Sequence, residues 1–314
     1  MGALVGLAPL SGGLFLGWAL GANDAANVFG TAVAARIIPY WRAALLCACF
    51  VVLGAALQGA AGIETLSAIT TQTVTTAVIV SIASAITVTA MTILKLPVST
   101  SQGVVGAILG IGLATDRTEL GPLLKVVLCW IGTPIGSLII AVIAYKVLAF
   151  GFRRAPMSMF TRDKILWSGL LLVGLYGSYA LGANNVTNTV GMFSGLLPGV
   201  SDRLLAVIGG LAIASGTITF GRRVMLRLGS GIMRLDAFTA FVAVLSMSIT
   251  VHVFAIVGAP ISTTQGIVGA TLGIGFLRGA HAIHFNALRH IVVGWVFTPI
   301  MALILAAAGY AIFC

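Results

Sequence analysis

Ten long apolar segments, separated by short polar stretches, run through the 314-residue chain. A helix needs roughly 20 mostly apolar residues to cross the hydrocarbon core of a bilayer. Segments that approach or exceed this length lie at residues 9–35, 43–62, 74–94, 97–113, 123–149, 166–195, 204–219, 238–257, 260–277 and 288–313. Only 8% of the residues are charged, whereas about a quarter are charged in soluble domains. The sequence therefore predicts an all-α, polytopic membrane protein.

The second half of the chain repeats the first. The run PVSTSQGVVGAILGIG, which begins at Pro97, recurs as PISTTQGIVGATLGIG from Pro260. Two further pairs of runs match in the same order: LGANDAANVFG with LGANNVTNTVG, and WIGTPI with WVFTPI. Three ordered matches at nearly constant spacing indicate a duplication. We expect a first repeat at residues 1–150, a basic connector at 151–165 and a second repeat at 166–314.

The distribution of basic residues predicts the orientation of the chain. They gather after the first segment, between the halves and after the seventh segment: Arg36, Arg42, Lys146 to Lys164, Arg222, Arg223, Arg227 and Arg234. The alternate loops are neutral or acidic and contain Glu64, Asp116, Arg117, Glu119, Asp202 and Arg203. The positive-inside rule explains the formal net charge of +10 and places both termini outside, with no nucleic-acid partner.

Each half then has an odd number of crossings, so the two halves are inserted in opposite directions. Such inverted-topology repeats of about five segments are typical of secondary transporters. The fourth segments, 97–113 and 260–277, are short and either cross or re-enter the membrane, because broken helices are tolerated at that depth where protein covers them. We expect such broken helices near the midplane.

One acidic residue, Asp24, lies well inside a predicted span, where an uncompensated charge costs at least about 2.5–3.5 kcal/mol. It belongs to the run GANDAAN, whose counterpart in the second half carries Asn185 at the equivalent position. Carboxylate and amide oxygens, with carbonyls of a locally unwound helix, form the shell that a hard cation prefers. The candidate cation-binding residues are Asn23, Asp24, Asn27, Asn184, Asn185 and Asn188. The alternative is that these side chains only bond neighbouring helices.

A second repeated feature is a hydroxyl-rich run that follows a proline and precedes a Gly-rich apolar stretch. Proline at the first turn with hydroxyls beside it is typical of a helix N-terminus. Inside the membrane, the free N–H groups and the helix dipole would bind an anion without a cationic side chain. The candidate anion-binding residues are Ser99, Thr100, Ser101, Gln102, Ser262, Thr263, Thr264 and Gln265. The alternative is that the hydroxyls bond the preceding turn while the glycines pack helices.

The run GANDAANVFGTAV with its second copy, together with the paired P-x-S-T-x-Q-G-x-V-G segments, resembles the inorganic phosphate transporter (PiT) family over nearly the whole chain. The resemblance implies cation-coupled secondary transport of inorganic phosphate, with sodium or protons as the driving ion and bound sodium in place of any cofactor. It implies a homodimer in the cell membrane. It also implies that the two residue groups named above bind the cation and the anion. Phosphate-transporting members usually have a second aspartate where this chain has Asn185.

Two alternatives remain open from the sequence. A sulfate permease of the same family is favoured by Asn185, although Asp24 favours phosphate, because hydrogen phosphate can donate a proton to a carboxylate and sulfate cannot. An anion channel with the hydroxyl runs as its filter is the second. An enzyme is not expected, since no span holds a metal-binding pair or an activated serine. His252 is expected to be a packing residue, and His281, His284 and His290 are expected to be solvated.

Overall fold

The computed structural model describes residues 8–93, 98–227, 233, 235–279 and 284–314. Each of the ten predicted segments corresponds to one long helix. These helices are α2 (Ser11–Ala34), α3 (Tyr40–Gln58), α5 (Val74–Ile93), α6 (Thr100–Thr115), α7 (Leu120–Arg154), α8 (Met159–Val190), α9 (Asp202–Thr219), α11 (Ala237–Val257), α12 (Thr263–Arg278) and α13 (Phe285–Phe313). Shorter elements join them: η1 (Ala8–Leu10), α4 (Ala60–Ser67), η2 (Gly191–Phe193) and α10 (Gly221–Arg227). The all-α prediction is confirmed.

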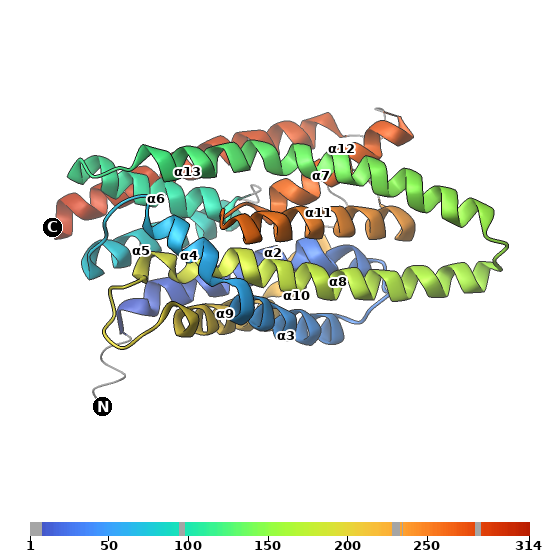
Figure 1. Ribbon diagram of the computed structural model, residues 1–314, viewed down its shortest axis with the longest axis horizontal. Coiled ribbons are helices and arrows are strands. Elements are labelled where there is room, and N and C mark those ends of the chain that lie inside the picture. Colours follow the sequence, from blue (N-terminus) through green and yellow to red (C-terminus); the bar gives the residue numbers. More distant parts are fainter. Residues whose placement is uncertain (1–7, 94–97, 228–232, 234, 280–283) are drawn as a thin grey trace.

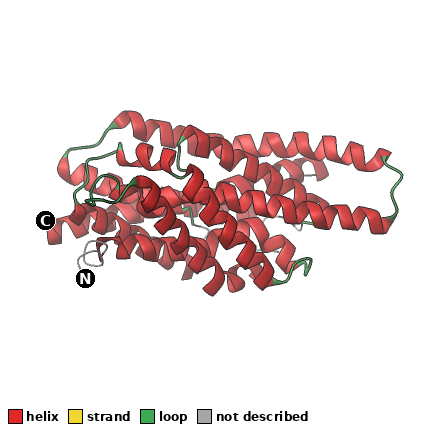
Figure 2. Ribbon diagram, turned by 60° about the horizontal axis from the view of Figure 1, so that its bottom comes forward, coloured by secondary structure: helices red, strands yellow, loops and turns green. Residues whose placement is uncertain are grey.

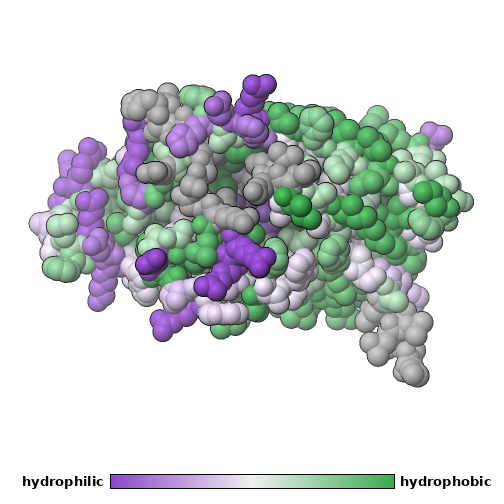
Figure 3. Space-filling view, turned by 180° about the vertical axis from the view of Figure 1, so that it is seen from behind, coloured by the Kyte–Doolittle hydropathy of each residue, from purple (hydrophilic) through white to green (hydrophobic). Residues whose placement is uncertain are grey.

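The long helices lie side by side along the longest axis of the molecule, as Figures 1 and 2 show. Seven of them, in the described part of the chain, are long and apolar enough to span a membrane: α3, α5, α7, α8, α9, α11 and α13. On α7, Ile131, Ile135, Ile139 and Ile143 recur every fourth residue and are all exposed, as expected of a lipid-facing stripe. Figure 3 shows apolar residues over much of one half of the molecule and hydrophilic residues gathered in the other. The chain is a multi-pass membrane protein.

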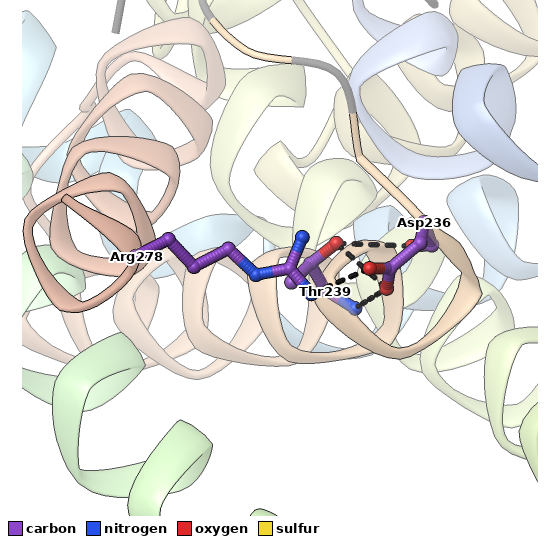
Figure 4. A network of polar contacts seen from close by, with 3 residues as sticks. All are labelled: Asp236, Thr239 and Arg278. Atoms are coloured by element: carbon purple, nitrogen blue, oxygen red, sulfur yellow. Dashed lines mark hydrogen bonds and ion pairs between the residues drawn. The ribbon is translucent and has the colours of Figure 1, made fainter. Parts of the chain in front are cut away.

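The α5–α6 and α11–α12 pairs are hairpins, each of which begins and ends at the same end of the bundle. Next to the open end of the first, the Glu119 backbone N–H donates to the carbonyl of Ile69 at 2.8 Å. Across the open end of the second, Arg278 pairs with Asp236 at 2.5 Å (Figure 4). The tips lie at residues 98–99 and 258–262, and Gly258 adopts a left-handed conformation there (φ 74°). Each short fourth segment therefore returns toward the end where the third began.

Equivalent contacts occur twice, with the two halves exchanged. Gly106 on α6 packs against the backbone of Pro299 on α13, and Gly269 on α12 packs against the backbone of Pro134 on α7. In Figure 1, α2 runs away from the end where α13 finishes, whereas α8 runs toward it. These reciprocal contacts match the repeated sequence runs, because each run has a glycine where two helix backbones meet closely.

The predicted connector at 151–165 is mostly helical. α7 continues to Arg154 and α8 begins at Met159, so only residues 155–158 lie between them. Pro156 disfavours a helical conformation at the residue before it, and the Ser158 hydroxyl accepts a hydrogen bond from the backbone N–H of Thr161 at 3.2 Å, which caps α8. Helix-forming residues on both sides of this turn extend the two spans beyond the apolar runs. Of the basic residues used for orientation, Arg234 lies outside the described residues.

The α11 N-terminus is stabilised by Asp236. Its carboxylate accepts hydrogen bonds from the backbone N–H and the hydroxyl of Thr239 at 2.9 and 3.0 Å, and from Arg278. Burial raises the pKa of Asp236, but the bonds from Thr239 and Arg278 outweigh this effect and hold the pKa below its ordinary value. A lowered pKa means that the charged form stabilises the fold at neutral pH, and that this stability is lost as the pH falls through the folded-state pKa.

We expect Asp236→Ala to reduce the free energy of unfolding by about 1–2 kcal/mol, since it removes a helix cap and a partly exposed ion pair. Asp236→Asn should retain the cap and recover about half of this loss. Chemical denaturation of the purified protein in detergent, at pH 7 and at pH 3, measures both effects. Equal stability of the alanine variant and the wild type at pH 7 would contradict this role.

Candidate functional site

The two Asn-rich runs lie in continuous helices. α2 and α8 pass through residues 23–27 and 184–188 without a break, so the expectation of a locally unwound helix there is wrong. Backbone carbonyls in these runs are engaged in the helix, and only side chains are free to bind. The backbone is broken instead at the hairpin tips, which pack against these two helices.

Asp24 meets its counterpart from the other half. The Asn185 amide donates to the Asp24 carboxylate at 2.9 Å, and the amide of Asn23 donates to its other oxygen at 3.1 Å. Asp24 is 4% exposed and Asn185 is 1% exposed. The carboxylate is therefore enclosed among neutral amides, with no cationic side chain among the hydrogen-bond partners described for it. A buried carboxylate in such surroundings needs a cation or a proton to balance its charge.

Each Asn-rich helix also reaches the hydroxyl run of the opposite half. The Asn27 amide on α2 lies 3.2 Å from the hydroxyl oxygens of both Thr263 and Thr264 at the start of α12. In the equivalent contact, Asn188 on α8 donates to the hydroxyl of Ser101 on α6 at 3.0 Å. The two candidate residue groups predicted from the sequence therefore form one cluster, built crosswise from both halves.

The hairpin tips contact each other within this cluster. Ser101 donates to the backbone carbonyl of Ile261 at 2.7 Å. Asn184 forms two hydrogen bonds with the second tip. Its amide donates to the carbonyl of Ala259 at 3.0 Å, and its oxygen accepts from the backbone N–H of Ile261 at 3.2 Å. The sequence does not indicate which main-chain groups would take part. Only the equivalent positions of the two runs in the repeats suggested that they lie close together.

Both hydroxyl runs start helices, as predicted. Ser99 and Ser262 are the N-caps of α6 and α12, and their hydroxyls accept from the backbone N–H groups of Gln102 and Gln265 at 3.4 and 3.3 Å. Pro260 lies two residues before the cap rather than in the first turn, and Pro97 lies outside the described residues. Two helix N-termini, with the positive ends of their dipoles, thus begin inside the bundle.

Several buried polar atoms of this cluster have no hydrogen-bond partner among the described residues. They are the side-chain oxygens of Thr100, Gln102, Asn185, Asn188 and Gln265. The orientation of two of the amides is fixed by their donors: Asn185 faces a carboxylate, and Asn188 faces a hydroxyl that already donates elsewhere. Their free carbonyl oxygens are acceptors enclosed in protein, which is the donor set that an oxygen-seeking cation uses.

The described histidines lie apart from this cluster. His252 bonds Tyr176 at 2.9 Å and Gln58 at 2.8 Å, which confirms its packing role. His290 bonds the carbonyl of Asn286, and His281 lies outside the described residues. Among the described residues, no three His, Cys, Asp or Glu side chains are grouped to hold a metal ion.

A bundle of membrane helices with a buried polar cluster, where the tips of two helical hairpins meet, is typical of membrane transporters. The sequence matches the Phosphate transporter family over residues 20–306. The chain belongs to that family, as the resemblance in its repeated runs indicated.

Similar proteins include transporters for two oxyanions. The "Putative phosphate permease MJ0630" of Methanocaldococcus jannaschii is 30% identical, covering 93% of this chain and 92% of its own. The sulfate permease CysP of Bacillus subtilis is 28% identical, covering 95% and 85%. A solved structure of a sodium-dependent phosphate transporter shares the fold, with a TM-score of 0.88, 23% identity and coverage of 99% of both chains.

Proposed function

We propose that this protein is a secondary transporter that couples the movement of inorganic phosphate to that of sodium. The observation that carries the proposal is the crosswise cluster, in which the carboxylate of Asp24, free amide oxygens and two helix N-termini come together from both halves. The family supports phosphate as the substrate. The sodium-dependent protein with the same fold supports sodium as the driving ion. A proton gradient is the alternative driving force.

The anion would bind where α6 and α12 begin. Two helix N-termini supply backbone N–H groups and the positive ends of two helix dipoles, without a cationic side chain. The side-chain oxygens of Thr100, Gln102 and Gln265 lie at these N-termini without a described hydrogen-bond partner. Hydroxyl and amide groups can turn donors toward phosphate oxygens. The role assigned to the eight residues of the hydroxyl runs, Ser99 to Gln102 and Ser262 to Gln265, is therefore anion binding.

The cation would bind beside the anion, between α2 and α8. Asp24 supplies the negative charge, and Asn185 and Asn188 supply free carbonyl oxygens. Asn23, Asn27 and Asn184 complete the group through their bonds to Asp24 and to the α11–α12 hairpin. Opposite charges at close range in a low-dielectric interior attract strongly, so each ion raises the affinity for the other.

The architecture that we propose for transport is a pair of inverted repeats, residues 1–150 and 166–314, which give alternating access to this cluster. The reciprocal glycine contacts and the opposite directions of α2 and α8 support it. The basic clusters support a cytoplasmic connector and two external termini. We also propose a homodimer in the cell membrane, on the basis of the family resemblance.

Sulfate is the second candidate substrate. One of the relatives is a sulfate permease, and Asn185 leaves the cluster with a single carboxylate. Asp24 nevertheless favours hydrogen phosphate, which can donate a proton to an acceptor where sulfate only accepts.

Uptake by reconstituted protein tests the proposal. Proteoliposomes are supplied externally with radiolabelled phosphate or sulfate in separate experiments, with an inward gradient of sodium, of protons or of neither. Concentrative phosphate uptake that requires sodium supports the proposal. Uptake of sulfate alone would reassign the substrate, and rapid uptake that never exceeds the external concentration would indicate a channel.

The contact between the hairpin tips yields a specific prediction. Ser101→Ala removes the bond to Ile261 and leaves the buried Asn188 amide without an acceptor, which costs about 1–3 kcal/mol. We expect phosphate affinity to fall about tenfold. Ser246→Ala is the matched control, because the one bond described for this buried hydroxyl is to the carbonyl of Val242 in its own helix. Equal losses in the two variants would show that Ser101 has no special role.

A further inference from the structure

A second cluster of charged and aromatic side chains lies far from the two hairpin tips. An open cavity of about 380 Å³ lies between the α7–α8 turn and the open end of the α11–α12 hairpin. Its charged lining is supplied by Arg153 on α7, by Arg162 and Asp163 on α8, and by the Asp236–Arg278 pair of the hairpin. None of these residues takes part in the cluster around Asp24.

The wall of the cavity is aromatic. The Phe238 ring packs edge-on against Tyr145, with centroids 5.4 Å apart, and against Phe152, at 5.6 Å. The guanidinium of Arg162 lies 5.8 Å from the centre of the Phe152 ring. Met159, which also lines the cavity, is an exposed apolar residue. The cavity thus combines an apolar surface with guanidinium groups.

Two of the three arginines are free to bind an anion. Arg278 is paired with Asp236 (Figure 4), and this is the only ion pair among the residues that the structure describes. Within the described part of the chain, Arg153 donates only to the carbonyl of Ala149 in its own helix. Three arginines and two aspartates leave a formal charge of one positive unit in the lining. A single phosphodiester, with one negative charge, would balance it.

The cavity lies at the level expected for lipid headgroups. The α7 residues between Lys125 and Lys146 are uncharged and are about 30 Å long, which equals the hydrocarbon thickness. On α8 the apolar run starts at Ile165, and Trp167 is exposed next to it, as aromatic residues are at membrane interfaces. Arg162 lies three residues before Ile165, and Arg153 lies about 10 Å of helix beyond Lys146. The bond of Arg153 to Ala149 directs its guanidinium back toward the membrane.

We propose that this cavity binds the headgroup of an anionic phospholipid, with Arg153 and Arg162 on its phosphodiester and the aromatic wall against its glycerol. Basic pockets between membrane helices on the cytoplasmic side recognise anionic headgroups in this manner. A bound lipid would contact both the α7–α8 turn, which joins the two halves, and the open end of the α11–α12 hairpin. It would thereby link these two segments. The site is separate from the transported ions, so it does not rest on the proposed transport activity.

The experiment titrates the purified full-length protein in detergent with phosphatidylglycerol and counts bound lipid by native mass spectrometry. We expect one phosphatidylglycerol to bind the wild type at least tenfold more tightly than it binds Arg153→Gln/Arg162→Gln. Phosphatidylcholine should bind both proteins equally. Arg222→Gln/Arg223→Gln, which removes two arginines lining another cavity, should bind phosphatidylglycerol within about twofold of the wild type.

The charge-retaining variant Arg153→Lys/Arg162→Lys keeps the test decisive if the glutamine variant is unstable, and it should bind within about threefold of the wild type. Equal affinity of the wild type and the glutamine variant would overturn the proposal. So would displacement of the lipid by millimolar inorganic phosphate, which would identify the site as one for a free anion. An equal loss of phosphatidylglycerol affinity in the Arg222 and Arg223 control would also overturn the proposal, because net charge alone would then explain the effect.

Discussion

Asp24→Asn is expected to reduce sodium-driven phosphate uptake at least 30-fold while leaving the protein folded. The substitution keeps the shape of the side chain and removes the only charge among the side chains of the described cluster. Interactions with a charged group in a buried site are worth about 1.5–3 kcal/mol each, and 2 kcal/mol corresponds to about 30-fold in affinity. Initial rates of radiolabelled phosphate uptake into proteoliposomes measure the effect.

Asp116→Asn serves as the matched control for this substitution. Asp116 ends α6 in a left-handed conformation (φ 52°), which asparagine adopts as readily as aspartate, and it lies outside the cluster. We expect uptake by this variant within about twofold of the wild type. Sodium-dependent uptake by Asp24→Asn at the wild-type rate would show that the cation binds elsewhere.

Gly182→Ala should be among the most destabilising single-methyl substitutions in the chain. A Cβ atom at this position would overlap the backbone of Val51 on α3, and a backbone atom cannot turn aside as a side chain can. Overpacking of this kind costs typically 1–3 kcal/mol and occasionally more, and we expect about 3 kcal/mol. Gly21→Ala should have a similar cost, because it would overlap the backbone of Ile213 in the equivalent contact.

Chemical denaturation in detergent measures both losses, and Gly121→Ala provides the control. A methyl group added at Gly121 would meet no described atom within 4 Å, and alanine favours the helix in which this residue lies. We expect the stability of this variant to match or exceed that of the wild type. A pair of glycine variants with very different costs would argue against equivalent packing of the two halves.

The helices could be predicted from the sequence because apolar runs of this length have few alternatives in a membrane. The hydroxyl runs were placed correctly at helix starts, since Ser99 and Ser262 cap them. The end of α7 and the start of α8 were less predictable. Their helices extend past the apolar residues into charged ones, where helix propensity and the Ser158 cap decide the boundary rather than hydropathy.

The partners within the candidate site could not be predicted. Asn27 and Thr263 are far apart in the chain, and they meet because α2 of the first half packs against the start of α12 in the second half. The expected unwinding around Asp24 was wrong for a related reason. Asn185 reaches Asp24 from the other helix, so side chains surround the carboxylate while both helices stay intact.

The central claim is that a cation and phosphate bind in contact within one buried cluster. Isothermal titration of the purified protein with phosphate, in sodium and then in choline at equal ionic strength, tests it most directly. We predict phosphate binding at least tenfold tighter in sodium, and sodium binding tighter by the same factor in phosphate, because linkage between two sites is reciprocal. Equal phosphate affinity in sodium and choline would contradict the account.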